Sequence, residues 1–261
     1  MSAIRVVPVQ LEDAPVLAVI ASNSFESDAQ TEMKGHGQTP FDIGDYTLKA
    51  VPQHLKNPRI RIIKAVDEET GAIMGFCLWG FRGLTPPVFP DQPVDEVPPS
   101  KPSATENDKA DALPAVESPA EKPDDPIARL VALTDADLKD WMDTAMPPGT
   151  SCLYVVSLCV APAFQRRGVG SALLKWGTDM AEAGDTFAWV HSSAGAWRAY
   201  EKAGFRIVRI LEVDLDEYAP VPAPAERYPG GRWGVYVFRY MVALPNYMVL
   251  AEAVSCEVGK C

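Results

Sequence analysis

One segment in the second half of the chain restricts the fold more than any other, the run LYVVSLCVAPAFQRRGVGSALLKW that begins at Leu153. The stretch Ser151–Val160 is almost uniformly apolar, which is typical of a buried strand. From about Val169 to Ala183 the spacing is that of an amphipathic helix. Between them lies Gln165–Ala172, with glycines at positions 168 and 170. The run predicts a buried strand, a glycine loop and a helix in succession.

The glycine loop has the features of an anion-binding turn. Glycine lets the backbone approach a phosphate closely, and the first amides of the helix point outward with the positive end of the helix dipole behind them. Arg166 and Arg167 either add positive charge or are simply solvated. A dinucleotide-binding fingerprint needs a third glycine where Leu173 stands, and no Gly-Lys-Ser/Thr of a P-loop follows. A tight turn that needs glycine only for its backbone angles is the alternative interpretation.

Composition narrows the class of protein. A chain of 261 residues with 47% hydrophobic residues can build one substantial core. The net charge of -11 disfavours binding to nucleic acid. No apolar run approaches the roughly 20 residues of a spanning helix, and the N-terminus lacks a signal-peptide pattern. Five scattered cysteines without metal-ligand spacing indicate free thiols and no metal. We expect a cytoplasmic protein without membrane association.

The chain between Leu84 and Pro126 changes character abruptly, with Pro, Asp, Glu, Ser, Ala and Lys dominating. Such a composition buries too little apolar surface to offset the entropy of ordering. We therefore expect a single domain over residues 1–261 with a mobile, Pro-rich, acidic insertion at 84–126. A C-terminal tail is expected at 246–261. A lid or partner-docking role for the insertion is the less favoured alternative.

Periodicity predicts the remaining elements. Before the insertion, the expected elements are strands at Ile4–Val9, Arg59–Asp67 and Ile73–Phe81 and helices at Leu11–Phe25 and Asp42–Leu55, the last limited in length by Gly44 and Pro52. After the insertion, we expect a helix at Pro126–Met146 with a break near Thr134. The strand, glycine loop and helix described above follow it. The last expected elements are strands at Thr186–His191, Phe205–Asp214 and Trp233–Val242 and a short helix at Gly195–Lys202.

Two motifs together resemble a known family. The pattern Gln-x-x-Gly-x-Gly after a strand, with Ala199-Tyr200-Glu201-Lys202-Ala203-Gly204-Phe205 downstream, is similar to the GNAT superfamily of N-acyltransferases. The resemblance covers roughly Ser151–Asp214. It implies an α/β (α+β) fold with a central mixed, mostly antiparallel sheet of about seven strands, helices on both faces and a splayed pair of central strands.

The resemblance also implies a binding site for acetyl-CoA. Backbone groups of Leu158, Cys159 and Val160 would pair with the pantetheine arm, as in a β ladder. Ser193 would lie near that arm, where family members often carry Asn. Tyr200 matches the tyrosine that protonates the departing thiolate. The diphosphate would be held by the loop, namely Gln165, Arg166, Arg167, Gly168, Val169, Gly170 and Ser171.

The acceptor half of the site is less determined by the sequence. Family members often place a Glu or His base on the central strands, but Ser151–Val160 contains no carboxylate. His191 ends the next strand and is our candidate base. Asp28 and Trp79 are candidates for binding the acceptor, with core packing the favoured alternative for Trp79.

The expected activity is acetyl transfer from acetyl-CoA, by direct attack, to a primary amine of a small molecule. The alternatives are a protein lysine or N-terminal acetyltransferase and a noncatalytic CoA-binding interaction protein, which would share the same cofactor half. The expected assembly is a monomer or a homodimer.

Overall fold

The structure is a computed structural model that describes residues 3–89 and 125–245. Its centre is one sheet of seven strands in the order β1-β2-β3-β4-β5-β7-β6. Neighbouring strands are antiparallel except β4 and β5, which are parallel. The mixed, mostly antiparallel sheet predicted from the resemblance is confirmed. The strands are β1 (Ile4–Pro8), β2 (Ile60–Asp67), β3 (Ile73–Arg82), β4 (Cys152–Val160), β5 (Phe187–Ser192), β6 (Arg206–Asp214) and β7 (Val235–Ala243).

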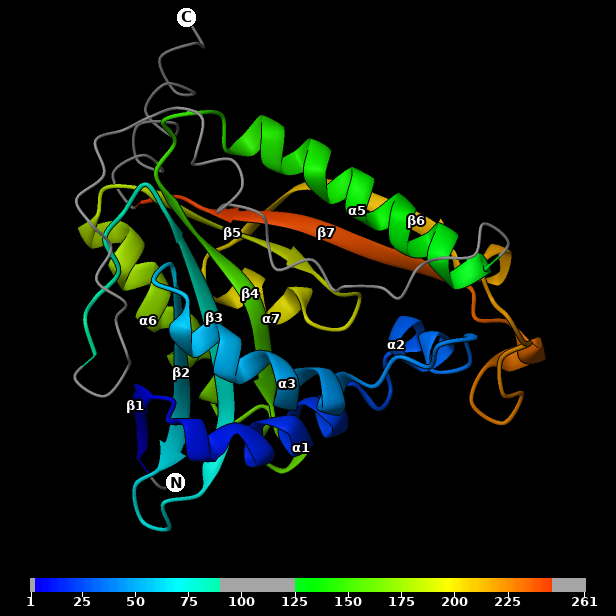
Figure 1. The fold of residues 1–261 in the computed structure, drawn as a ribbon, viewed down its shortest axis with the longest axis horizontal. Coiled ribbons are helices and arrows are strands. Elements are labelled where there is room, and N and C mark those ends of the chain that lie inside the picture. Colours follow the sequence, from blue (N-terminus) through cyan, green and yellow to red (C-terminus); the bar gives the residue numbers. More distant parts are fainter. Residues whose placement is uncertain (1–2, 90–124, 246–261) are drawn as a thin grey trace, which may run out of the picture.

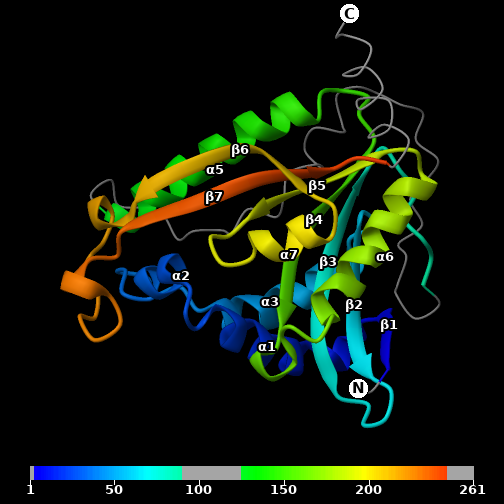
Figure 2. The same cartoon turned by 180° about the vertical axis from the view of Figure 1, so that it is seen from behind.

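Helices cover both faces of the sheet. Three of them, α1 (Ala14–Phe25), α3 (Ile43–Lys56) and α5 (Pro126–Ala145), lie on the face shown in front in Figure 1. The opposite face carries α6 (Val169–Ala183) and α7 (Trp197–Lys202), in front in Figure 2. A short helix, α2 (Ala29–Lys34), lies beside the connection between β6 and β7 (Figure 1). The central strands β4 and β5 are therefore covered by one set of helices on one face of the sheet and by a different set on the other.

The two central parallel strands diverge. β4 and β5 pair from Cys152↔Phe187 to Val155↔Val190, and the pairing then stops although β4 continues to Val160. A bulge lies at the same level, because Trp79 pairs with Val155 while Leu78 pairs with Ser157. A bulge bends a strand and increases its twist. The bend carries the second half of β4 away from β5, which confirms the expected splayed pair.

Helix α3 continues through Pro52, so the prediction that this residue limits the helix is wrong. Proline deprives the preceding turn of one hydrogen bond, here at the carbonyl of exposed Leu48, where water can replace it. Buried Val51 and Leu55 secure the helix on either side of the proline. Gly44, the other expected limit, lies where α3 packs closely against Ala18 and Ser22 of α1. Tertiary packing outweighs local propensity in this helix.

Helix α5 runs without a break from Pro126 to Ala145, so the predicted break near Thr134 is wrong. The hydroxyl of Thr134 donates to the carbonyls of Leu130 and Val131, so the residue stays helical. Leu130 and Trp141 bury their side chains beneath the helix. The helix is therefore fixed to the sheet along its length.

Two expectations fall largely outside the described residues. Of the Pro-rich insertion predicted at 84–126, residues 90–124 are not described, and neither is the predicted tail at 246–261. Within the described ranges, no helix is both long and apolar enough to cross a membrane.

Candidate active site

Two residues of the glycine loop between β4 and α6 have a left-handed backbone conformation. Gly168 has φ +88° and is the residue before the helix, and Arg166 has φ +59°. Where left-handed residues alternate with right-handed ones, successive backbone amides point toward one side of the loop, as in an anion-binding nest. No side chain caps the first turn of α6, and no acidic residue stands there. The free amides at this end of a 15-residue helix are suited to an anion.

Gly170 distinguishes the two interpretations of the loop. A β-carbon at this position would meet only Cγ2 of Val160, at 3.8 Å, an ordinary van der Waals distance. Gly170 also lacks a positive φ, so the fold itself does not require glycine there. Glycine in a helix costs roughly 0.5–1 kcal/mol relative to alanine. Space for a ligand that approaches the backbone explains its presence, whereas Gly168 is needed for its conformation.

The two loop arginines differ. The Arg167 guanidinium lies over the Phe164 ring, 5.7 Å from its centroid. Arg166 is exposed in its left-handed position at the centre of the loop. Val169 buries its side chain in the core, so only its backbone faces the loop. Arg166 is therefore the loop cation most available to an anion.

The divergent half of β4 supplies the strand side of the site. Leu158, Cys159 and Val160 lie beyond the last pair with β5. The carbonyl of Val160 accepts hydrogen bonds from Ser24 Oγ at 3.0 Å and from Gln165 Nε2 at 3.1 Å. Gln165 thus braces the loop against the strand with its side chain. Because that carbonyl is occupied, Leu158 and Cys159 offer the freer backbone for a ligand.

Tyr200 projects from α7 into the core beneath α6, where it packs with Leu173 and meets Phe205 edge-on at a centroid distance of 5.7 Å. Burial raises the pKa of its phenol well above the ordinary value, and the thiols of Cys77 and Cys159 raise it further. Both thiols lie near the divergence of β4, so Tyr200 lies there as well. The hydroxyl stays protonated over the physiological range and can act as a proton donor.

His191 lies on the other face of the sheet. Its ring stacks on Tyr240 at 4.5 Å and 9°, and contacts Phe238 at 4.9 Å. Its Nε2 atom is buried and has no hydrogen-bond partner among the residues that the structure describes. Burial lowers the pKa of His191 to about 4, an effect that Asp137 of α5 partly opposes. The structure therefore places the two candidate catalytic residues on opposite faces, at the end of β5 where the strands part.

Acid should destabilise the protein through His191. The ring is neutral in the fold, with a pKa of about 4, whereas an unfolded chain binds the proton near pH 6.5. Stability is present above the unfolded value and is lost as the pH falls from 6.5 toward 4, by at most about 3 kcal/mol. Replacing His191→Phe should flatten this limb in thermal melts, while His36→Gln at an exposed histidine should not. An unchanged acid limb in the Phe variant would contradict the assignment.

Asp28 and Ser193, predicted on opposite halves of the site, meet at Tyr236. The Tyr236 hydroxyl donates to Asp28 Oδ1 at 2.7 Å. Burial and the Asp28 carboxylate raise the pKa of this phenol, and hydrogen bonds from Ala194 and Ser193 partly oppose the shift. Asp28 Oδ2 accepts from both the amide and the hydroxyl of Thr31. With both carboxylate oxygens occupied, Asp28 caps α2 and braces β7, and its contacts do not support the expected role in binding the acceptor.

Trp79 is a core residue rather than a wall of the acceptor pocket. It is fully buried against α6, and a β-carbon at Gly177 would overlap its indole ring. The indole N–H donates to the carbonyl of Leu173 at 3.4 Å. The structure supports core packing, which was the favoured alternative for Trp79 in the sequence analysis, because the side chain does not reach the surface of the protein.

A second set of contacts holds α2 to the loop that joins β6 and β7, and the sequence did not predict it. Tyr228 donates to Glu32 Oε2 at 2.8 Å, and Arg227 donates to Glu32 Oε1 at 3.1 Å. Partners nearly 200 residues apart leave no local signal. Over residues 3–89 and 125–245, no group of three or more His, Cys, Asp or Glu side chains is placed to hold a metal ion.

Comparison with known proteins agrees with this geometry. The model of the acetyltransferase (GNAT) family matches residues 86–205. Arylalkylamine N-acetyltransferase 2 from Aedes aegypti is 13% identical, with a TM-score of 0.53, over 93% of this chain and 99% of that one. A mosquito arylalkylamine N-acetyltransferase-like protein, 5b, is 15% identical, with a TM-score of 0.52, over 93% and 100%.

Drosophila melanogaster polyamine N-acetyltransferase, which forms N-acetylagmatine, is 16% identical, with a TM-score of 0.52, over 93% of this chain and 100% of that one. Among curated proteins, none matches the chain significantly. At these identities the structures share the fold alone, a seven-stranded sheet with helices on both faces. The family match covers the β4 strand, the glycine loop and Tyr200, so residues 86–205 match the acetyltransferase (GNAT) family, and the sheet around them has the fold of these N-acetyltransferases.

Proposed function

We propose that this protein is an acyltransferase that transfers an acetyl group from acetyl-CoA to a primary amine of a small molecule. The observation that carries the proposal is the loop at the start of α6, whose uncapped amides and open space at Gly170 adjoin the divergence of β4 from β5. A diphosphate fits the loop, and an extended pantetheine arm fits beside strand residues that lack a ladder partner. Leu158 and Cys159 are the proposed partners of that arm.

The proposed chemistry is direct attack of the amine nitrogen on the acetyl carbonyl. A new C–N bond forms while the C–S bond of the thioester breaks. The amine loses one proton, and the sulfur gains one from Tyr200, whose raised pKa keeps the proton at Oη until it is needed. Acetyl-CoA supplies the activated acyl group when bound. The protein contributes orientation at the loop and this proton.

His191 is the proposed contact to the acceptor amine. An unsatisfied buried polar atom costs about 1–3 kcal/mol, and such atoms often mark functional sites. Its Nε2 lacks a donor, and an amine N–H bound beside Phe238 would supply one. A pKa of about 4 suits the ring to accept a hydrogen bond rather than to retain the proton. The final proton acceptor is then water reached through the acceptor side.

A small amine is favoured over a protein substrate. The acceptor face beside His191 is covered by α5, and the loop between β6 and β7 is fastened to α2 through Glu32. A peptide needs an open groove, whereas a compact amine does not. The arylalkylamine and polyamine N-acetyltransferases that share the fold are named for small amines.

A thiol-release assay with acetyl-CoA tests the proposal across polyamines, arylalkylamines, amino acids, aminoglycosides and basic peptides. We expect at least one class of small amine to exceed the best peptide about tenfold or more in kcat/KM, because the covered acceptor face admits compact ligands. Run on His191→Phe, the same assay should show a raised KM for the amine with an unchanged KM for acetyl-CoA. Preference for peptides would favour a protein acetyltransferase, and no turnover on any class would remove the enzymatic proposal.

A further inference from the structure

A second buried nitrogen without a hydrogen-bond partner lies under α5, in addition to Nε2 of His191. The indole N–H of Trp141 is buried and meets no acceptor among the residues that the structure describes. The indoles of the three other buried tryptophans, Trp79, Trp189 and Trp233, each donate to an acceptor within 3.4 Å. Burying an N–H without a partner costs free energy, so a buried indole usually finds one. Trp141 is the exception, and a ligand with an acceptor atom would remove its cost.

Trp141 and His191 both pack against the same ring, that of Tyr240. The Trp141 ring lies 4.9 Å from it at an angle of 30°, and the His191 ring lies 4.5 Å from it at 9°. Helix α5 lies over β5 and β7, the strands that carry His191 and Tyr240 (Figure 1). An indole N–H can only donate, whereas the neutral imidazole can accept at Nε2. One small molecule with a donor and an acceptor can therefore satisfy both nitrogens.

The rings around Trp141 do not replace the missing acceptor. Trp189 meets it at 67° with the ring centroids 6.1 Å apart, so this neighbour offers an N–H···π contact at most. Such a contact is weak beside a hydrogen bond to oxygen. Trp141 is 9% exposed and His191 is half-buried, so both rings lie near enough to the surface for a compact ligand to reach them.

The charges beside these rings favour a neutral oxygen as the acceptor. Asp137 accepts from the Tyr240 hydroxyl and pairs with Arg209, which also pairs with Asp140 at 2.7 Å. Two carboxylates thus face one guanidinium, and the local net charge is negative. A carboxylate on the ligand would be repelled, whereas an ammonium would be attracted. A hydroxyl, ether or carbonyl oxygen therefore suits the indole N–H better than a carboxylate does.

We propose that Trp141 is a specificity-determining residue and that the acceptor is a primary amine carrying a neutral oxygen. The inference rests on the proposed function. The amine nitrogen donates to Nε2 of His191, and the oxygen accepts from the Trp141 N–H. An alkylamine of the same length would leave the indole without a partner and would be the poorer substrate.

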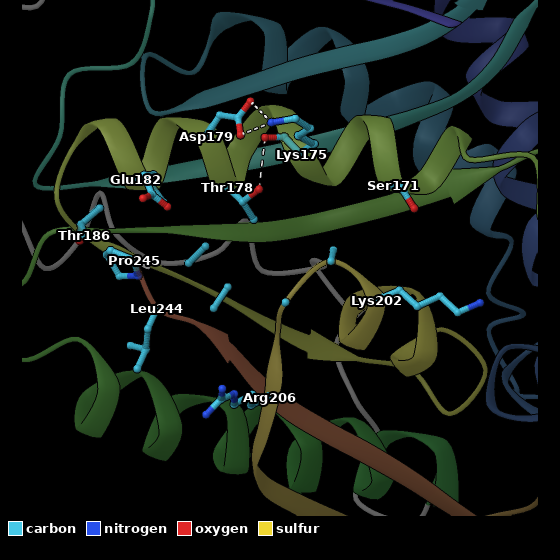
Figure 3. A pocket seen from close by; sticks show the side chains of 15 residues that line it. Ser171, Lys175, Thr178, Asp179, Glu182, Thr186, Lys202, Arg206, Leu244 and Pro245 are labelled. Atoms are coloured by element: carbon cyan, nitrogen blue, oxygen red, sulfur yellow. Dashed lines mark hydrogen bonds and ion pairs between the residues drawn. The ribbon is translucent and has the colours of Figure 1, made fainter. Parts of the chain in front are cut away.

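Binding of the donor should not depend on Trp141. The groove of about 500 Å³ that adjoins the glycine loop runs along α6 from Ser171 to Glu182 (Figure 3). Helix α6 covers the face of the sheet opposite α5 (Figure 2). The KM for acetyl-CoA is therefore an internal control for any change under α5.

The test compares pairs of amines that differ by one oxygen in place of a methylene. The pairs are 2-methoxyethylamine with butylamine, 3-methoxypropylamine with pentylamine, and 4-methoxybutylamine with hexylamine. With acetyl-CoA, at least one alkoxyamine should exceed its partner about tenfold in kcat/KM, the effect of one hydrogen bond in a buried site. Trp141→Phe keeps an aromatic ring and loses the N–H, so this pair should become equal while the KM for acetyl-CoA is unchanged. Trp176→Phe, a matched control on α6 that packs against Phe81, should keep the preference.

Nuclear magnetic resonance gives a readout that does not depend on turnover. The indole N–H signal of Trp141, identified by its loss in Trp141→Phe, should move downfield when the preferred alkoxyamine binds to the protein loaded with CoA. The matched alkylamine should leave the signal in place. A signal that moves with both amines or with neither would contradict a hydrogen bond from Trp141 to the oxygen.

The kinetic outcomes separate the two proposals. Turnover of amines without a preference in any pair, or a preference that survives Trp141→Phe, would overturn the inference and leave the proposed function standing. Turnover of other amines but of none of these six would overturn it as well. Faster turnover of 4-aminobutanoate than of 2-methoxyethylamine would contradict a neutral oxygen. No turnover on any class of amine would overturn the proposed function and this inference with it.

Discussion

Replacing Gly170→Ala is expected to weaken CoA binding about 10- to 100-fold and to leave the protein as stable as before or slightly more so. The β-carbon has room in the fold, since its nearest neighbour lies at 3.8 Å, and alanine favours a helix over glycine by roughly 0.5–1 kcal/mol. A ligand that approaches the same backbone would be displaced and lose one or two charge-assisted hydrogen bonds, each worth about 1.5–3 kcal/mol. Calorimetry with CoA and thermal melts measure the two effects.

Gly168→Ala is the matched control. At φ +88° any side chain is strained, so this variant should lose roughly 1 kcal/mol of folding stability, opposite in sign to the Gly170 variant. Tight CoA binding by Gly170→Ala would mean that the ligand does not approach the loop at this position. The glycine pattern would then reflect a turn and nothing more.

Tyr200→Phe should lower kcat about 100-fold or more while leaving the KM for acetyl-CoA within about twofold. General acid catalysis contributes roughly 10²–10⁴ in rate, and the ring itself, which packs against Phe205, is retained. Because the pKa of the phenol is raised well above 10, the wild-type rate should show no loss from ionisation of Tyr200 up to pH 10. Initial rates across pH provide both readouts.

A tyrosine far from the divergence of β4 provides the control for this variant. Tyr218 lies after β6, where Arg129 rests over its ring, and Tyr218→Phe should change kcat by less than about twofold. If Tyr200→Phe retains full activity with intact CoA affinity, another group protonates the sulfur. Retained affinity with no activity in the wild-type protein as well would instead indicate a noncatalytic CoA-binding protein.

The sequence predicted the strand, glycine loop and helix between Ser151 and Ala183 well because their signals are local. The apolar strand, the glycine loop and the helix after it follow one another in the chain, so periodicity and backbone chemistry suffice to locate them. The residues after Asp28 also carry a local signal for a helix. An aspartate three residues before a threonine and followed by helix-forming residues is typical of a helix N-cap, and it would have predicted α2.

The acceptor half could not be predicted because it depends on contacts between distant segments. Trp79 is buried by α6, a helix about 90 residues later in the chain, whose Leu173 and Gly177 lie against the indole ring. The burial of His191 depends on α5, whose Asp137 and Trp141 reach the same face from about 50 residues earlier in the chain. Neither effect leaves a trace near the residue that it concerns.

The antiparallel pairing of β3 with β4 bears on the length of the connection between them, which contains α5. These strands are antiparallel neighbours whose ladder ends at Arg82↔Cys152, so residues 83–151 form one hairpin connection. Loop-closure entropy rises by only about 0.6 kcal/mol per doubling of length, or about 2.4 kcal/mol from a four-residue turn to this one. Burying Leu130 and Trp141 under α5 contributes roughly 1.5–3 kcal/mol for each side chain. A long connection at this point therefore costs little loop-closure entropy, and the side chains that α5 buries contribute in the opposite direction.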